Sequence, residues 1–93
     1  MRRIEYTGQF KRDYKREARG PHRATLEKGF RDILTALMND QPIPRKCYDH
    51  AMSGEWKDHR DCHIKPDLVL IYRKPDAERL QLVRLGSHAE LGL

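Results

Sequence analysis

Long apolar runs are missing from this sequence, and so is a dense set of cysteines. No stretch approaches the ~20 apolar residues of a membrane-spanning helix, and the opening MRRIEYTGQF lacks the apolar segment of a secretory signal. The two cysteines, Cys47 and Cys62, do not make the disulfide framework of a small secreted domain. These absences argue against a membrane protein and a disulfide scaffold, and we expect a cytoplasmic protein.

Repeats, low-complexity segments and linker-like stretches are also lacking, so the chain is expected to form a single domain over residues 1–93. A domain of this size buries a modest fraction of its surface, and its stability is low unless a bound partner adds to it. Apolar residues still make up 38% of the chain and are clustered enough to build a core, which argues against disorder.

Positive charge is concentrated at one end of the sequence. The net charge is +5; residues 1–31 carry ten Lys and Arg against four Asp and Glu, whereas the remainder carries nine against ten. Such a basic region attracts phosphate backbones in a salt-dependent way. A solvated basic helix or a docking surface for an acidic protein explains the same pattern, so charge alone leaves these alternatives open.

The spacing of apolar residues predicts one strand, two helices and then three strands. The expected ranges are Arg3–Tyr6, Gly8–Arg19, Pro21–Met38, Glu55–Ile64, Leu68–Arg73 and Arg79–Leu85. Short turns between the last three strands indicate an antiparallel meander, and the short connection between the helices indicates a helical hairpin. We therefore expect an α+β fold, in which an antiparallel sheet of about four strands carries the N-terminal helical hairpin on one face.

Histidines and cysteines suggest two kinds of site. Cys47 and His50, together with His59 and Cys62, could supply the four ligands of a zinc ion. The second pair lies on a predicted strand, however, and side chains three apart on a strand point to opposite faces. One of His59 and Cys62 would have to turn away, which argues against the metal site.

Strand alternation favours a different group of residues. Asp61 and His63 share one face of their strand, and Asp67 follows after a tight turn. Segments carrying His50, Arg84 and His88 can reach the same end of the sheet. Imidazoles transfer protons near neutral pH, and a guanidinium can hold a phosphate. Each of these residues taken alone is more often structural than catalytic.

Several motifs together resemble a known family. They are Ile4-Glu5-Tyr6-x-Gly8-Gln9, Asp49-His50, Gly54-x-Trp56-Lys57, Arg60-Asp61-x-His63-x-x-Pro66-Asp67, Leu70-Ile71-Tyr72 and Arg84-x-Gly86-x-His88-Ala89. Across nearly the whole chain they are similar to the YafQ branch of the RelE toxins, which belong to type II toxin–antitoxin systems. The resemblance implies a RelE-like fold and a ribosome-dependent mRNA interferase that cuts messages in the A site, preferentially at adenine-rich lysine codons.

The same resemblance implies a mechanism and its residues. The ribose 2′-hydroxyl attacks the adjacent phosphate without metal or other cofactor, leaving a 2′,3′-cyclic phosphate. His50 and His63 become candidates for proton transfer supported by Asp67, Arg84 holds the scissile phosphate, and His88 protonates the leaving oxygen. Contacts to ribosomal RNA would come from basic side chains, namely Lys57, Lys11, Arg12, Lys15 and Arg16.

The resemblance also implies partners and shows departures. A DinJ-like antitoxin protein would neutralise the toxin, and the pair would bind its own promoter DNA. Relatives carry a tryptophan directly after the turn aspartate, where this chain has Leu68, and an aromatic near the C-terminus, where it has Leu91-Gly92-Leu93. Both differences reduce the expected base stacking and leave the codon preference open.

Two rival functions fit the basic scaffold. One is a non-enzymatic ParE-type toxin that inhibits a protein target such as a DNA topoisomerase. The other is a nucleic-acid-binding repressor component, for which the basic helices suffice. His50, His63 and His88 distinguish the nuclease from both rivals, because neither rival needs all three imidazoles.

Overall fold

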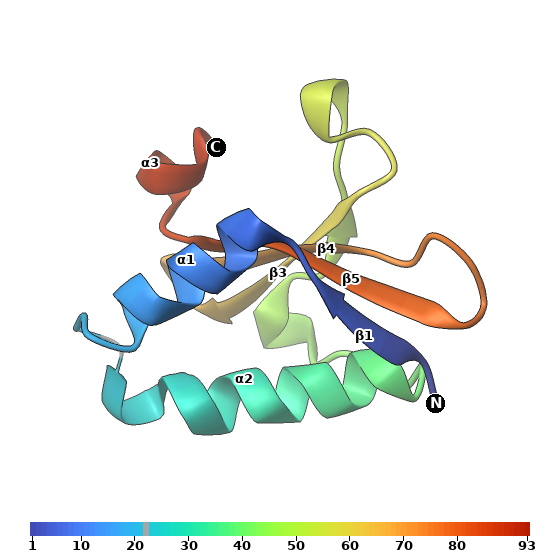
Figure 1. Cartoon of the computed structure of the whole chain (residues 1–93), viewed down its shortest axis with the longest axis horizontal. Coiled ribbons are helices and arrows are strands. Elements are labelled where there is room, and N and C mark those ends of the chain that lie inside the picture. Colours follow the sequence, from blue (N-terminus) through green and yellow to red (C-terminus); the bar gives the residue numbers. More distant parts are fainter. Residues whose placement is uncertain (22) are drawn as a thin grey trace.

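A computed structural model describes residues 1–21 and 23–93 of the chain. The elements in chain order are β1 (Arg3–Tyr6), α1 (Gly8–Glu17), α2 (Arg23–Met38), the 3₁₀ turn η1 (Arg45–Cys47), β2 (His50–Ala51), the 3₁₀ turn η2 (Gly54–Trp56), β3 (Arg60–Lys65), β4 (Leu68–Arg73), β5 (Arg79–Gly86) and α3 (His88–Leu91). In Figure 1 the sheet runs through the middle of the molecule, with α2 on one side and α3 and the η2 loop on the other.

The sheet has five strands in the order β1-β5-β4-β3-β2. The expected antiparallel meander is present, because β3, β4 and β5 pair with antiparallel neighbours. The expectation of an all-antiparallel sheet of about four strands is wrong in two respects: β1 pairs in parallel with β5, and the short β2 adds a fifth strand beside β3. The β1–β5 pairing joins the two ends of the chain, so no local turn in the sequence indicates its direction.

The two helices begin and end inside their expected ranges. Thr7 caps α1, because its hydroxyl accepts a hydrogen bond from the backbone N–H of Phe10 at 3.0 Å. Phe30 of α2 stacks on Phe10 with ring centroids 5.9 Å apart. The helical hairpin is confirmed only in part, because α1 contacts β5 whereas α2 contacts β3. The two helices therefore share an aromatic contact, while their backbones approach different strands of the sheet.

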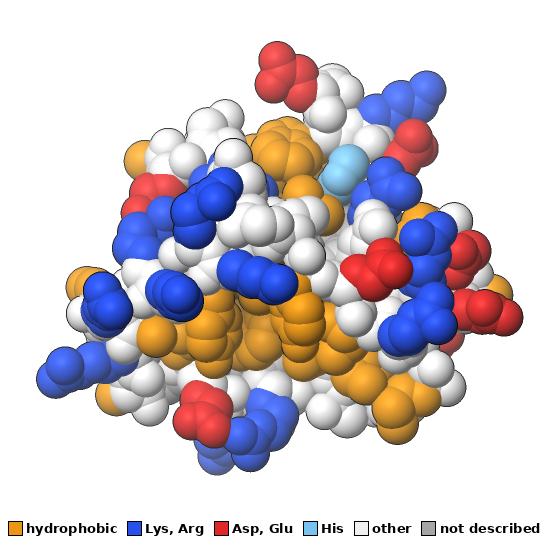
Figure 2. All heavy atoms as spheres, in the orientation of Figure 1, with side chains coloured by type: hydrophobic (Ala, Val, Ile, Leu, Met, Phe, Trp, Pro, Cys, Tyr) orange, Lys and Arg blue, Asp and Glu red, His pale blue; other side chains and the backbone are white. Residues whose placement is uncertain are grey.

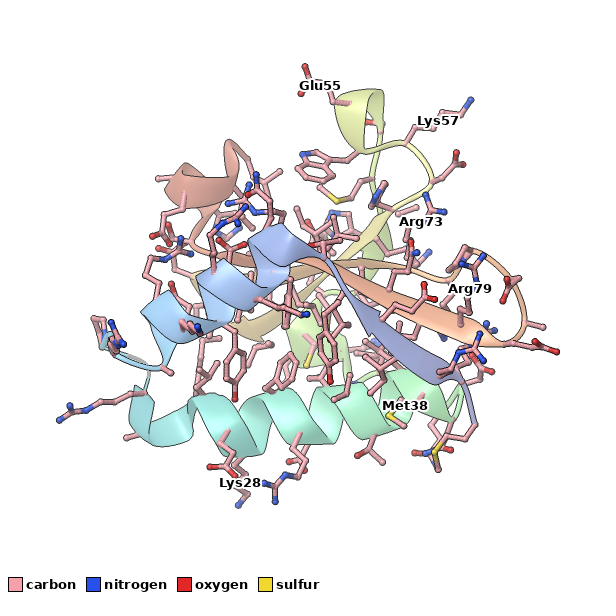
Figure 3. The ribbon with its side chains drawn as sticks, in the orientation of Figure 1. Lys28, Met38, Glu55, Lys57, Arg73 and Arg79 are labelled. Carbon is pink, nitrogen blue, oxygen red and sulfur yellow. The ribbon has the colours of Figure 1, made fainter. Side chains whose placement is uncertain are left out.

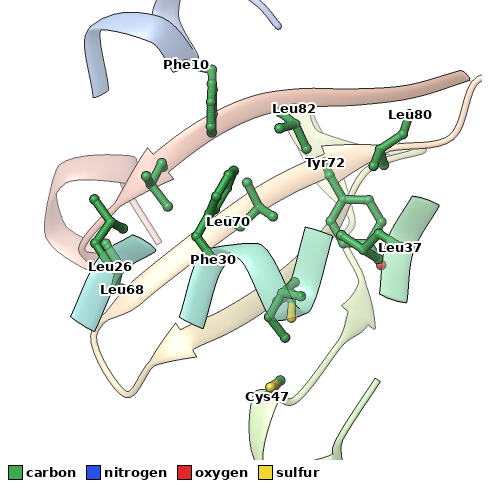
Figure 4. Close-up of a cluster of buried hydrophobic side chains, with 13 residues drawn as sticks. Phe10, Leu26, Phe30, Leu37, Cys47, Leu68, Leu70, Tyr72, Leu80 and Leu82 are labelled. Carbon is green, nitrogen blue, oxygen red and sulfur yellow. The ribbon is translucent and has the colours of Figure 1, made fainter. Parts of the chain in front are cut away.

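The main core lies between the sheet and α2. Leu70 and Tyr72 of β4 and Leu80 and Leu82 of β5 are fully buried and face the apolar side of the helix, which includes Leu37 (Figure 4). Such burial contributes about 1.5–3 kcal/mol for each large apolar side chain.

Helix α2 approaches β3 closely at Gly29. A Cβ atom there would lie 3.2 Å from the Cγ2 atom of Ile64. Glycine costs helix stability at an interior position, and this close approach explains its presence there.

A smaller apolar cluster occupies the opposite face of the sheet. Val69, Ile71 and Leu91 are buried there, and Met52 and Trp56 pack against them. Leu91 belongs to α3 and Trp56 to η2, so these two elements flank this face without covering all of it. Within the described residues, no helix is both long and apolar enough to cross a membrane.

Candidate active site

Histidines from three separate segments meet on the face of the sheet opposite α2. His50 lies in β2, His63 in β3, and His88 opens α3. All three line a hollow of ≈ 620 Å³, together with Tyr48, Met52, Trp56, Asp61 and Leu93 among others. In Figure 3 this region lies between α3 and the η2 loop, from which Glu55 and Lys57 project outward. The expected convergence of the three imidazoles is therefore present.

His63 stands at the centre of the group. Its ring is perpendicular to that of His88, with centroids 5.1 Å apart, and lies 5.8 Å from the ring of Tyr48. Asp61, two residues earlier on β3, lines the same hollow, whereas the intervening Cys62 is buried in the core between the sheet and α2. Strand alternation alone places His63 and Asp61 on the working face.

His88 is oriented by Asp67 from the β3–β4 turn. One carboxylate oxygen of Asp67 accepts a hydrogen bond from the backbone N–H of His88 at 3.0 Å and lies 2.7 Å from Nδ1 of the same residue. A capping box between Ser87 and Glu90 fixes the first turn of α3. Since a carboxylate accepts, Nδ1 of His88 carries a proton, and Nε2 is the nitrogen left for a substrate.

His50 is held by the backbone of Tyr48. Nδ1 of His50 donates to the carbonyl oxygen of Tyr48 at 2.9 Å, so in the neutral ring Nε2 is the basic nitrogen. The Oδ1 atom of Asp61 lies 2.9 Å from the same Nδ1, but the bond to Tyr48 uses the proton. This carboxylate oxygen is buried and has no hydrogen-bond partner among the described residues.

Asp61 is consequently an unusual buried carboxyl group. It is 4% exposed, and burial raises its pKa above the ordinary value, against the attraction of His50, His63 and His88. A buried carboxylate oxygen that has no hydrogen-bond partner among the described residues can accept a rearranged hydrogen bond from a neighbouring imidazole during proton transfer. Strand alternation groups Asp61 with His63 but by itself gives Asp61 no role.

Arg84 faces the same side of the sheet but lies beside the histidine pocket rather than among the residues that line it. It pairs across the strands with Ile71, which in turn pairs with Asp61. Its Nε and Nη2 atoms donate to the carboxylate of Asp13 in α1 at 2.7 and 3.3 Å. A guanidinium has five donors, so this anchoring leaves others available to an anion.

The expected basic residues differ in their surroundings. Arg16 is engaged within the fold, because its guanidinium contacts Asp13, Glu17 and Glu90 and donates to the backbone oxygen of Leu85. Lys11 and Lys15 border an apolar hollow between α1 and α2. In Figure 2 this hollow lies in a band of hydrophobic side chains, with Lys and Arg side chains above it.

The alternative zinc site is not assembled in the described part of the chain. Cys47 and Cys62 lie in the main core, whereas His50 lines the histidine hollow and His59 contacts the backbone oxygen of Lys57. No group of three or more possible ligands among the described residues has the arrangement of a metal site.

Leu68 and Tyr48 differ in whether their side chains can reach the histidine hollow. Leu68 is fully buried in the main core, on the side away from the histidines. Tyr48 is 63% exposed, and its ring centroid lies 4.4 Å from that of His50. The sequence assigns Tyr48 no role, although its position two residues before a candidate catalytic histidine is a usable signal.

Comparisons with known proteins relate nearly the whole chain to one family of toxins. A family model described as "Bacterial toxin of type II toxin-antitoxin system, YafQ" matches residues 2–92. The chain is 38% identical to the mRNA interferase toxin YafQ of Escherichia coli K12 over 92 residues, which cover 98% of this chain and 96% of the relative.

Solved structures are similar as well. The toxin in a crystal structure of the Escherichia coli DinJ–YafQ complex superposes with a TM-score of 0.82 at 36% identity, covering 98% of each chain. A metal-bound toxin from Helicobacter pylori has a TM-score of 0.87 at 40% identity, covering 98% of this chain and 99% of its own.

Proposed function

The chain belongs to the YafQ family of toxins of type II toxin–antitoxin systems, and from this premise we propose that it is an endoribonuclease that inhibits translation by cleaving messenger RNA on the ribosome. The observation that carries the proposal is the convergence of His50, His63 and His88 around one hollow. A toxin that acts by binding a protein target has no need of this arrangement.

The proposed reaction is an intramolecular transesterification. The 2′-oxygen of a ribose attacks the adjacent phosphorus while the bond from phosphorus to the 5′-oxygen of the next nucleotide breaks. The products are a 2′,3′-cyclic phosphate and a free 5′-hydroxyl. No covalent intermediate with the protein forms, and both proton transfers can be carried out by imidazoles, without metal or cofactor.

The proton transfers follow from the hydrogen bonds of the two outer histidines. We assign His50 as the base that removes the 2′-hydroxyl proton, because its Nδ1 proton is held by the carbonyl of Tyr48. The contact with Asp67 fixes the Nδ1 side of the His88 ring and leaves Nε2 for the substrate, so we assign His88 as the acid that donates to the leaving 5′-oxygen. His63 lies beside both Tyr48 and His88 and would share the transfer.

Charge developing on the phosphate needs a cation nearby. Arg84 would supply it, because Asp13 holds its guanidinium in a fixed orientation on the same face of the sheet. A preorganised guanidinium stabilises the transition state without first losing conformational freedom.

Action in the ribosomal A site is proposed from the family resemblance and from the distribution of positive charge. Lys57 beside the pocket and Lys11, Arg12 and Lys15 along α1 would contact ribosomal RNA, with Arg16 bracing α1 against β5 and α3. Cleavage at adenine-rich lysine codons is part of the same proposal, and so is a cytoplasmic location.

A DinJ-like antitoxin is the proposed protein partner. The Escherichia coli YafQ toxin forms a crystallised complex with DinJ, and the net charge of +5 here suits an acidic partner. The pair is further proposed to bind its own promoter DNA. A tightly bound antitoxin would also stabilise so small a domain by mass action.

The experiment that tests the function maps new 5′ ends of cellular messages after brief expression of the chain. We expect ends clustered at in-frame lysine codons in wild type and none with His88→Ala. His59→Ala is the matched control, since His59 does not line the hollow. Growth arrest without new 5′ ends would favour a ParE-like protein target, and unchanged cleavage by His88→Ala would overturn the catalytic assignment.

A further inference from the structure

A second hollow adjoins the histidine site on the far side of His63. It measures ≈ 480 Å³ and is lined by Lys46, Cys47, His63, Ile64, Lys65 and Pro66. Because His63 also lines the histidine hollow, the two spaces meet at this ring. Strand β2 pairs only with Arg60 and Asp61, so it leaves the rest of β3 open along the edge where this second hollow lies.

The charge of this second hollow is positive. Two lysines line it, and its described lining contains no carboxylate. Neither Lys46 nor Lys65 makes an ion pair within the described residues. Asp67, two residues after Lys65, contacts His88, and Asp49, three residues after Lys46, pairs with Arg60. Ammonium groups that are not already paired suit a phosphate group.

Tyr48 lies beside His63, the residue that lines both hollows. It follows Cys47 in the chain, lines the histidine hollow, and places its ring 4.4 Å from His50 and 5.8 Å from His63. Its backbone adopts the left-handed conformation (φ 46°), which is uncommon for a residue with a large side chain. The ring is nevertheless 63% exposed, so this turn presents an aromatic surface to solvent at the site.

An exposed ring beside two unpaired cations matches the way proteins hold single-stranded RNA. Bases stack on aromatic side chains, and cations follow the phosphate backbone. We propose that Tyr48, Lys46 and Lys65 form a nucleotide subsite, in which Tyr48 stacks against the base of a nucleotide flanking the cut and the two lysines bind its phosphate. This inference rests on the proposed function and identifies its substrate contacts beyond the reacting phosphate.

Leu68, which follows the turn aspartate, is not placed to stack on a base in this chain. Its side chain is buried on the helix side of the sheet and has no access to a base at the histidines. Tyr48 is the exposed aromatic residue that contacts two of the three histidines. Base stacking in this chain is therefore assigned to the η1–β2 connection rather than to the start of β4.

The test measures single-turnover cleavage of a defined message on programmed ribosomes by the full chain. We expect Tyr48→Leu to reduce cleavage at subsaturating toxin by about tenfold or more, and Tyr48→Phe to stay within about twofold, since the ring is kept. Tyr6→Leu is the matched control, because Tyr6 is also exposed but lies at the end of β1. Thermal melting checks that each variant is folded.

Two further experiments distinguish a loss of base stacking from a general loss of cleavage activity. A message with an abasic nucleotide beside the cut should slow the wild type but not slow Tyr48→Leu further. Lys46→Ala with Lys65→Ala should weaken cleavage and reduce its salt dependence, whereas Lys28→Ala on α2 should not.

The outcomes distinguish the two hypotheses. If wild type does not cleave, the proposed function fails and the subsite fails with it. If wild type cleaves and Tyr48→Leu matches Tyr6→Leu, the stacking assignment is overturned while the nuclease stands. If the abasic message slows wild type and Tyr48→Leu equally, the flanking base is bound elsewhere.

Discussion

Asp13 and Asp61 are almost equally buried, at 3% and 4% exposed, yet their pKa values shift in opposite directions. Burial opposes ionisation of Asp13, but hydrogen bonds from Arg84 and the backbone N–H of Leu85 outweigh it and hold the pKa below 3.8. Burial of Asp61 is not offset in this way, and its pKa is raised above 3.8.

The difference separates a carboxylate whose hydrogen bonds join two elements of the fold from one that lines the histidine hollow. Asp13 joins α1 to β5 through contacts 71 and 72 residues apart in sequence, and every such bond lowers the free energy of the folded state. Asp61 keeps a buried oxygen without a hydrogen-bond partner among the described residues, which costs stability. Functional residues commonly reduce stability in this way, and the position of Asp61 beside the three histidines suits a role in proton transfer.

The largest effect is expected at the satisfied carboxylate. Asp13→Asn removes the charge that pairs with Arg84 and Arg16 and leaves a half-buried guanidinium without its partner. We expect the free energy of unfolding to fall by about 2–4 kcal/mol. Urea denaturation followed by circular dichroism measures this, and a loss below about 1 kcal/mol would show that the network is not structural.

Asp61→Asn should give the opposite combination of effects. Stability should be unchanged or rise by about 1 kcal/mol, because a buried charge with an unpaired oxygen is removed. Cleavage should fall by about tenfold or more, because the histidines lose a nearby negative charge. Denaturation and single-turnover cleavage on the same preparation provide both values.

A double-mutant cycle sharpens this second prediction. Asp61→Asn combined with His50→Gln should be less damaging to the cleavage rate than the two single effects together predict, since Asp61 acts through the imidazoles. Independent, fully additive losses would contradict that coupling.

The next smaller effect is on the pH dependence of stability, to which Asp13 and Asp61 should contribute with opposite sign. Asp13 stabilises the folded state above its unfolded pKa, and this contribution is lost as pH falls through the lowered folded pKa. Asp61 has a raised folded pKa, so its contribution becomes less favourable as pH rises from about 3.8 through that higher value. Subtracting the stability profile of each Asn variant from wild type should give curves of opposite slope. Curves of the same slope would remove the distinction between the two residues.

An exposed ion pair should produce the smallest change. Glu27 and Arg31 form an i, i+4 pair on α2, and both side chains are more than two-thirds exposed. Glu27→Gln should alter the free energy of unfolding by no more than about 0.5 kcal/mol. A larger loss by denaturation would mean that burial is not what gives Asp13 its effect.

Local sequence patterns predicted much of the histidine site. Strand alternation placed Asp61 and His63 on one face of the strand, and the structure places the intervening Cys62 on the other. These features depend on neighbours within a few positions along the chain. The order of the strands allowed the segments that carry His50, Arg84 and His88 to reach the same end of the sheet, and the resemblance to YafQ toxins then implied a role for each.

Long-range features could not be read in the same way. The parallel pairing of β1 with β5 joins residues 76 positions apart, as in Ile4 with Leu80. The spacing of Phe10, Tyr14 and Ala18 predicts an apolar stripe on the first helix but gives no sign that Asp13 is buried beside Arg84. A charged side chain on a helix is usually solvated. Asp13 is buried because β5 packs against α1 at this position.

The nature of the reaction products tests the account most directly. Single-turnover cleavage of a defined message on programmed ribosomes, followed by analysis of both new ends, should give a 2′,3′-cyclic phosphate and a 5′-hydroxyl with wild type. His88→Ala, folded by thermal melting, should cleave at least about a hundredfold more slowly. Wild-type cleavage by that variant, or fragments that carry a 5′-phosphate, would contradict the assignment of the histidine pocket as a transesterification site.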